Sequence, residues 1–234
     1  MGAGVAVDDW RNSFGVNPAT TFSGGKFAAG ATYVQLYGLP DVKCGFWGAK
    51  WFPGKFATAI GLAAVGFNQY YENDILINFA TEPLAAFNLG IGIHLLLQTL
   101  TEYGVKFLPQ IDAGILWKSS CAAIGIAGKR LNAPRIPDGA VLKSQFRFGG
   151  LWEPVRELTL ALDLEKNEQA ERLLIGSEFR IFPEIFLRCG VETFPLIYHG
   201  GIQLNVSLVS IEYSYHYHHE FGVSHCIGVY GEWR

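Results

Sequence analysis

The residues best suited to chemistry gather near the C-terminal end of the chain, where histidines, serines and a glutamate share one stretch. His216 and His218 are two residues apart, so on a strand they lie on one face together with Glu212. A metal site needs three or four converging ligands. A Ser/His hydrolase using Ser224 or Ser214 with His216 needs an orienting carboxylate or amide and an oxyanion hole. Neither pattern is evident, so we expect no catalytic residue, no bound metal and no cofactor.

A second set comprises charged residues that alternate with apolar ones through the C-terminal half of the chain. The positive members are Lys143, Arg147, Arg172, Arg180 and Arg188, and the negative members are Asp163, Glu165, Glu178, Glu192 and Glu212. Such residues can line a polar, ion-selective path, or they can neutralise one another as cross-strand pairs. The five charges of each sign favour a paired network that fills an enclosed interior and conducts ions poorly.

A third set is a row of tyrosines at every second position, Tyr213, Tyr215 and Tyr217. Such a row forms one face of a strand. It is either a stripe that contacts a partner protein or a lipid-facing row that ends in an aromatic belt.

The elements that carry these residues alternate apolar and polar positions with a period of two, which predicts strands with one apolar face. We count about fourteen, centred at about residues 32, 46, 60, 77, 91, 113, 124, 147, 160, 176, 188, 204, 213 and 227. Each is about 10–12 residues long, the length of a transmembrane strand. The uncharged stretch 83–101 is long enough for a spanning helix, but its period of two favours a strand.

The composition supports a surface that faces lipid. The 234 residues are 50% hydrophobic and only 17% charged, below the ~25% typical of soluble chains. The mean hydropathy is +0.19. A net charge of -3 argues against nucleic acid as a partner. We therefore predict an all-β fold, a transmembrane antiparallel up-and-down β-barrel of about fourteen strands (26–234) with a short N-terminal hatch segment (1–25).

The connections give the barrel a direction. We expect short turns after even-numbered strands, around 52–54, 81–83, 118–120, 153–154, 182–183 and 208–209, and longer connections after most odd ones, notably 98–106 and 129–140. Short turns lie in the periplasm in outer-membrane barrels, so an even strand number predicts periplasmic termini. Aromatic residues near the short turns predict an interfacial girdle, formed by Trp51, Phe52, Phe79, Trp117, Trp152, Phe182 and Trp233.

The cysteines and the chain start say less about function. Cys44, Cys121, Cys189 and Cys226 have no zinc-ligand spacing, and the sequence leaves open whether any of them pair. The segment 1–7 has no basic region and too short an apolar core for a signal peptide. We expect either a mature form or a truncated start.

Three stretches together resemble the FadL-like outer-membrane barrels. The N-terminal GVAVDDWRNSFGVNPATTF resembles the hatch of that superfamily, with Asn17, Pro18 and Ala19 at its Asn-Pro-Ala motif. Residues 160–192 and 209–233 are similar to the hairpins and the closing strand pair of the PorV/PorQ branch, which is tied to type IX secretion. The resemblance implies a hatch within or under the barrel. The outer connections are short for the family.

These features lead us to expect a non-enzymatic barrel of the Gram-negative outer membrane. The first interpretation is a scaffold or accessory subunit that binds partner proteins of a secretion or envelope complex. The alternative is a FadL-type passive transporter of a hydrophobic small molecule. An apolar cavity that reaches a gap in the wall near the hatch favours transport, whereas an apolar outer stripe covered by another protein favours a scaffold.

Overall fold

The computed structural model describes residues 3–7, 9–100, 104–135, 141–168 and 170–233. It contains fourteen strands whose centres match those expected from the alternation. They are β1 (Phe27–Gln35), β2 (Lys43–Trp51), β3 (Phe56–Phe67), β4 (Tyr70–Leu84), β5 (Phe87–Leu100), β6 (Gly104–Lys118), β7 (Ala122–Lys129), β8 (Gln145–Val155), β9 (Leu158–Lys166), β10 (Glu171–Phe182), β11 (Ile185–Glu192), β12 (Ile197–Val206), β13 (Val209–His218) and β14 (Gly222–Trp233). Among the described residues, no helix has the length and apolar character needed to cross a bilayer.

The strands form a closed barrel in which each strand pairs with its sequence neighbours and β1 pairs with β14. The closing pair is antiparallel and runs from Phe27 opposite Trp233 to Gln35 opposite His225. Closure pairs the strand edges with one another, as a structure surrounded by hydrocarbon requires. The prediction of a fourteen-stranded transmembrane barrel is therefore confirmed.

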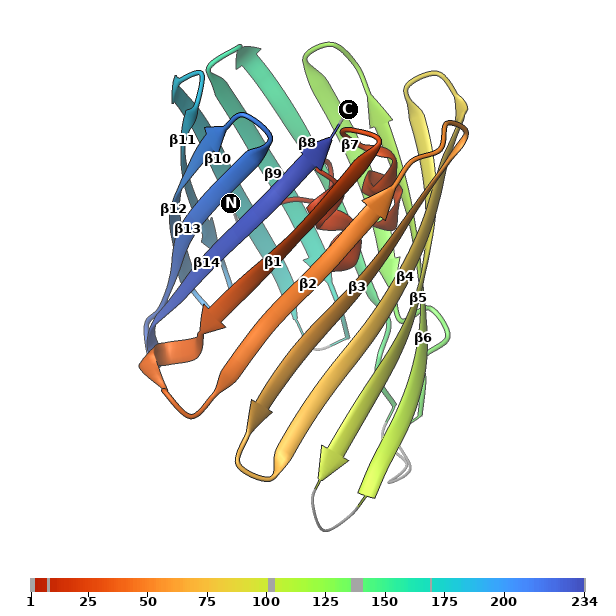
Figure 1. Ribbon diagram of the computed structural model, residues 1–234, viewed down its shortest axis with the longest axis vertical. Coiled ribbons are helices and arrows are strands. Elements are labelled where there is room, and N and C mark those ends of the chain that lie inside the picture. Colours follow the sequence, from red (N-terminus) through yellow and green to blue (C-terminus); the bar gives the residue numbers. More distant parts are fainter. Residues whose placement is uncertain (1–2, 8, 101–103, 136–140, 169, 234) are drawn as a thin grey trace.

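The two rims differ as expected, with short turns at the upper rim in Figure 1, where β14 ends and β1 begins. Two of the predicted turns were misplaced. Pro83 and Pro154 lie inside β4 and β8, in bulges where the register shifts, and the turns follow at 85–86 and 156–157. Proline lacks an N–H for the strand ladder and is accommodated at such bulges.

At the opposite rim, one of the two predictions of a long connection is wrong. The stretch 98–106 is mostly strand, because β5 and β6 pair from Leu100 and Gly104 onward, and only 101–103 lie outside the described residues. The predicted long connection at 129–140 is confirmed, since β7 ends at Lys129 and β8 begins at Gln145. Residues 136–140 of this connection also lie outside the described part of the chain.

The wall has an apolar outer face and a packed inner face. On β5, Leu89, Ile91 and Ile93 are exposed on the outside, while Asn88 and His94 are buried inside. The stretch 83–101, which was also weighed as a spanning helix, is therefore a strand with one apolar face. In the other strands, too, alternate residues point outward, and acyl chains cover their apolar side chains.

The girdle residues lie near the rim with the short turns, and six of the seven are exposed on the outer wall. Those six are Trp51, Phe79, Trp117, Trp152, Phe182 and Trp233. Phe52 is the exception, because its ring packs edge-on against Phe22 of the N-terminal segment, 4.6 Å between centroids. Phe52 follows the end of β2 and therefore turns toward the interior.

A charge on the outer wall tests this arrangement. We expect Ile91→Arg, near the middle of β5, to lower the free energy of unfolding by about 2–4 kcal/mol, the cost of Arg at the midplane of a barrel. Urea unfolding in lipid vesicles measures it, with Ile91→Leu as the control. Equal stability of the two variants would place this face away from hydrocarbon.

Candidate functional site: the plugged lumen

The N-terminal segment lies inside the barrel, and we call its described residues 3–7 and 9–25 the hatch. It contains two 3-10 helices, η1 (Trp10–Phe14) and η2 (Pro18–Phe22). Figure 1 shows it in red within the upper half of the lumen. Its apolar side chains are buried against the wall, with Trp10 and Phe14 packed on Ala28, Ala59 and Leu76. The hatch thus gives the narrow barrel its apolar core.

Glycines on the inner wall let the hatch approach closely. A Cβ at Gly114 would lie 1.9 Å from Asn17 Oδ1, and one at Gly90 would lie 2.3 Å from the Ala19 nitrogen. A Cβ at Gly125 would lie 2.3 Å from the Val5 carbonyl oxygen. No side chain fits at these distances, so β5, β6 and β7 present bare backbone where the hatch rests.

The Asn17-Pro18-Ala19 motif is the centre of this contact. Asn17 is fully buried and its Nδ2 donates to the carbonyl oxygens of Val5 at 2.9 Å and Ile115 at 3.1 Å. Its Oδ1 accepts from the Ala19 N–H at 3.0 Å, which caps η2, and Pro18 occupies the first turn of that helix. One side chain therefore joins two parts of the hatch to β6.

The start of the hatch is held by a buried carboxylate. Asp163 Oδ2 on β9 accepts from the N–H groups of Gly4 at 2.6 Å and Val5 at 2.9 Å. Arg147 on β8 lies 3.7 Å from the same oxygen and also pairs with Glu165. The pairing stabilises a carboxylate that is 1% exposed, since an unpaired buried charge is costly.

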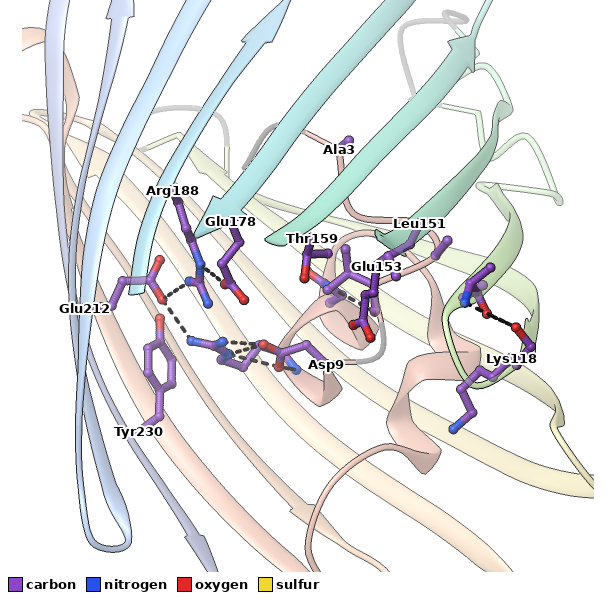
Figure 2. Close-up of a pocket in the computed structure, with 17 residues that line it drawn as sticks. Ala3, Asp9, Lys118, Leu151, Glu153, Thr159, Glu178, Arg188, Glu212 and Tyr230 are labelled. Carbon is purple, nitrogen blue, oxygen red and sulfur yellow. Dashed lines mark hydrogen bonds and ion pairs between the residues drawn. The ribbon is translucent and has the colours of Figure 1, made fainter. Parts of the chain in front are cut away.

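A second charged cluster ties η1 to β10, β11 and β13. Arg11 binds Asp9 through its Nε and donates from Nη1 to Glu212 Oε2 at 2.9 Å. Arg188 Nη1 lies 2.9 Å from the same Glu212 oxygen, and its Nε donates to Glu178 at 2.6 Å. Figure 2 shows Arg188 between Glu178 and Glu212, with Asp9 directed toward this group.

The cluster fixes the ionisation of the hatch residue Asp9. Burial opposes its ionisation, but the charge of Arg11 and the hydrogen bonds it donates outweigh burial, so the pKa of Asp9 lies below its ordinary 3.8. Arg11 also lies over the ring of Tyr230, 4.6 Å from the centroid, a cation–π contact. Arg11 therefore connects the hatch to the wall by charge and by an aromatic face.

Eight of the ten charges singled out in the sequence are brought together as ion pairs inside the lumen. They are Arg147, Asp163, Glu165, Arg172, Glu178, Arg188, Glu192 and Glu212. Arg180 instead donates to the Arg156 carbonyl oxygen at the short-turn rim. Lys143 was misplaced, because β8 begins at Gln145 and Lys143 pairs with exposed Glu168 outside the strands.

A buried polar cluster that the alternation along the chain does not reveal lies on the other side of the lumen. His94 Nδ1 lies 3.3 Å from Asp74 Oδ2, and its Nε2 lies 3.2 Å from Asp112 Oδ2. Strand parity places all three residues inward on β4, β5 and β6, but their separation in the sequence hid their proximity. Among the described residues, no group of three or more His, Cys, Asp or Glu is arranged to hold a metal ion.

The C-terminal histidines make local contacts, and the four cysteines are unpaired. His199 and His216 face inward with rings 4.7 Å apart, and His218 Nδ1 accepts from the Glu220 N–H at 3.1 Å. The cysteines are all free thiols. The lumen side chains therefore pack, pair and hold the hatch.

Polar cavities lie between the described residues of the hatch and the wall, and two of them adjoin Asp9. The larger, about 520 Å³, is drawn in Figure 2 and is lined by residues of the charged cluster together with Lys118, Glu153 and Thr159. The smaller, about 240 Å³, lies beside Asp9 and Tyr230. The hatch thus packs on the glycines and alanines of β2–β8. These cavities lie next to the part of the wall that carries the ion pairs, on β8–β13.

An apolar groove of about 640 Å³ lies on the outer side of β3–β8. Phe79, Ile91, Ile115 and other outward residues line it, and Gly90 and Gly114 also contribute. These two glycines carry the Asn17-Pro18-Ala19 motif on their inner side. Only the backbone layer of the wall separates the groove from the hatch at this place.

The groove ends where the pairing of β6 with β7 stops. β7 covers β6 only from Ala113 to Lys118. Beyond it, Leu131 N donates to the Ile111 carbonyl oxygen at 2.8 Å, and Asn132 Nδ2 donates to the Pro109 carbonyl oxygen at 2.8 Å. Leu131 also lines the groove. A loop segment therefore completes the wall here in place of a strand.

The tyrosine row lies on the outer wall of β13. Tyr213, Tyr215 and Tyr217 are 40–42% exposed. Tyr217 stacks on Tyr198 near the rim that carries the longer connections. A partner-binding stripe is one of the two interpretations of this row, and it stays a prediction.

Comparisons with known proteins place the fold among outer-membrane channels. The sequence matches no protein-family model and no curated protein sequence. Solved structures with similar folds include three at low identity. A Pseudomonas aeruginosa FadL homologue has a TM-score of 0.71 at 10% identity, with 100% of this chain and 96% of that chain covered. The P. putida toluene transporter TodX scores 0.70 at 10% identity, covering 99% and 94%. The monoaromatic hydrocarbon channel CymD scores 0.67 at 12% identity, covering 99% and 95%.

This likeness is one of fold. It supports the resemblance to FadL-like barrels seen in the sequence, and it does not distinguish the PorV/PorQ branch. Of these similar structures, TodX is a toluene transporter and CymD is a monoaromatic hydrocarbon channel.

The glycine contact can be tested by adding one methyl group. We expect Gly114→Ala to displace the Asn17-Pro18-Ala19 motif, to lower stability by about 1–3 kcal/mol and to raise ion conductance in planar bilayers. Gly150→Ala is the matched control, because a Cβ at Gly150 meets its nearest atom at 3.7 Å. Indistinguishable conductance of the two variants would show that the hatch does not rest on this wall.

The link between Asp9 and Arg11 predicts a pH dependence. Because the folded-state pKa of Asp9 is lowered, its contribution to stability is complete above pH 3.8 and declines as the pH falls through the folded-state pKa. At neutral pH, Asp9→Asn should cost about 1.5–3 kcal/mol, the range for a hydrogen bond to a charged group. The measurement is the difference in unfolding free energy between the two proteins across pH. A difference that stays constant into strong acid would contradict the ionic contact.

Proposed function

We propose that this chain is a passive channel of the FadL type in the Gram-negative outer membrane, which carries a small hydrophobic molecule past its hatch. The observation that carries this proposal is the apolar groove, which lies directly behind the part of the wall that holds the Asn17-Pro18-Ala19 motif. The similar structures include a toluene transporter and a monoaromatic hydrocarbon channel. A small aromatic or aliphatic molecule is the substrate class that fits the groove.

The two halves of the lumen suggest which side such a molecule follows. The wall from β9 to β13 carries buried and half-buried ion pairs, and an apolar solute gains nothing by contact with them. The inner wall near the hatch motif presents Leu116 and Ala123, which pack together with Ala19 of the motif. Movement of the hatch away from Gly90 and Gly114 would open a small apolar space on this side, next to the groove.

The orientation follows from the rims. The short turns and the ends of the barrel domain share one rim, and we propose that this rim faces the periplasm, as in bacterial outer-membrane barrels. The hatch and the polar cavities would then lie on the periplasmic side. Binding of partner proteins from a secretion complex has less support, because it rests on the tyrosine row alone.

The groove can be filled by a substitution that leaves the lumen unchanged. Ala113 points outward into the groove from β6, so Ala113→Trp should reduce uptake of radiolabelled toluene to the level of cells without the barrel. Ala29→Trp, on the outer face of β1, is the matched control. The assay uses Gram-negative cells with equal amounts of each variant in the outer membrane.

Two results would contradict the proposal. One is toluene uptake by cells with the unaltered chain that does not exceed uptake by cells lacking it. The other is an Ala113→Trp variant that takes up toluene as fast as the Ala29→Trp control.

A further inference from the structure

The inward face of β5 carries a buried amide that has no hydrogen-bond partner. Asn88 is 0% exposed, so bulk water does not reach it. Among the described residues, neither its Oδ1 nor its Nδ2 makes a hydrogen bond. Buried polar groups without partners are costly and rare in folded proteins. An amide kept at such a position needs a partner that the chain itself does not supply.

The surroundings of Asn88 are apolar. Its neighbour across the pairing of β5 with β6 is Leu116, which is fully buried and packs with Ala19 of the hatch motif. Two residues along the same face of β5, Gly90 lies directly beneath the Ala19 nitrogen. The amide of Asn88 therefore borders the apolar space that movement of the hatch would open.

A second set of unpartnered polar atoms lies farther along the same face. Asn78 of β4 is paired with Gly92 of β5, is 0% exposed, and donates from Nδ2 to the Ser13 carbonyl oxygen at 2.9 Å. Among the described residues, Asn78 Oδ1 and the Ser13 hydroxyl have no partner. A Cβ at Gly92 would lie 2.5 Å from Asn78 Oδ1, so the bare backbone of Gly92 leaves room for this oxygen.

The hatch motif separates these two polar positions. Asn88, Gly90 and Gly92 point inward at every second position of β5, about 7 Å apart. The Ala19 backbone rests on Gly90, in the middle of this row. We call Asn88, Gly90, Gly92 and Asn78 the β5 strip. Withdrawal of the motif would make the strip continuous, with an amide at each end and bare backbone between them.

The unpartnered atoms of the β5 strip match a hydroxyl group. Asn88 offers both a donor and an acceptor, whereas Asn78 offers an acceptor. A hydroxyl donates and accepts, so it can pair with either residue. A carbonyl oxygen only accepts, and a hydrocarbon leaves all of these atoms unpaired. A site that hydrogen-bonds a substrate hydroxyl discriminates against the analogue that lacks it.

We propose that the β5 strip selects small apolar molecules that carry one hydroxyl group, such as phenols. The inference rests on the proposed function, because the hatch covers the strip until it moves. The hydroxyl of the solute bonds Asn88 at one end of the strip and Asn78 Oδ1 at the other. Its ring lies against Leu116 and the bare backbone of the two glycines. A hydrocarbon of the same size fits the strip but gains no hydrogen bond there.

Uptake of radiolabelled p-cresol and toluene, which differ by one hydroxyl, tests this inference in Gram-negative cells without general porins. Uptake by cells lacking the barrel is subtracted. We expect the p-cresol-to-toluene ratio to fall at least about five-fold in Asn88→Leu, the effect of losing one neutral hydrogen bond, while toluene uptake continues. Asn205→Leu, which removes an amide beside the smaller polar cavity on β12, is the matched control and should keep the ratio of the unaltered chain.

The inference is overturned if Asn88→Leu keeps the ratio of the Asn205→Leu control, since Asn88 then does not bind the hydroxyl. It is also overturned if the unaltered chain takes up toluene but no p-cresol, a result that leaves the proposed channel intact. If neither solute enters faster than in cells lacking the barrel, the channel is wrong and this inference fails with it. Heat-modifiable migration in gels identifies folded barrels, and Asn88→Ala replaces Asn88→Leu if the latter does not fold.

Discussion

Backbone hydrogen bonding in a medium without water is the constraint on which this molecule depends. Hydrocarbon offers no partner for an N–H or C=O group, so the strand edges must close on one another. The pairing of β1 with β14 meets that requirement. Closure sets the side-chain pattern, because each strand must present apolar residues to lipid at every second position. The residues between them then face an enclosed lumen that has to be filled.

The lumen is filled in two different ways. On the β2–β8 side, glycines and alanines leave room for the hatch, whose backbone lies against theirs. On the β8–β13 side, longer charged residues meet across the strands and neutralise one another. Asp163 and Arg11 join the two halves, because one holds the start of the hatch and the other binds the wall from η1. The hatch is thus held by close packing on one side and by charge on the other.

The alternation along the chain predicts the strands and their faces well, because a period of two is a local property of the backbone. It also predicts which charged residues face the lumen, and eight of those ten form ion pairs with one another there. Positions at strand ends were harder to predict. Lys143 precedes β8, Phe52 turns inward onto Phe22, and Pro83 and Pro154 lie in bulges. The contact of His94 with Asp74 and Asp112 depends on register across three strands, which no local pattern reveals.

The central claim is that alternate residues of one strand face lipid and a packed interior. Spin labels placed singly at positions 89–95 of β5, in lipid vesicles, test it through collision with oxygen, which concentrates in the bilayer, and with a water-soluble nickel complex. The account predicts oxygen contact that peaks at positions 89, 91, 93 and 95 and falls at 90, 92 and 94, with little nickel contact at the outward positions. Uniform contact along the strand, or nickel contact at the outward positions, would contradict it.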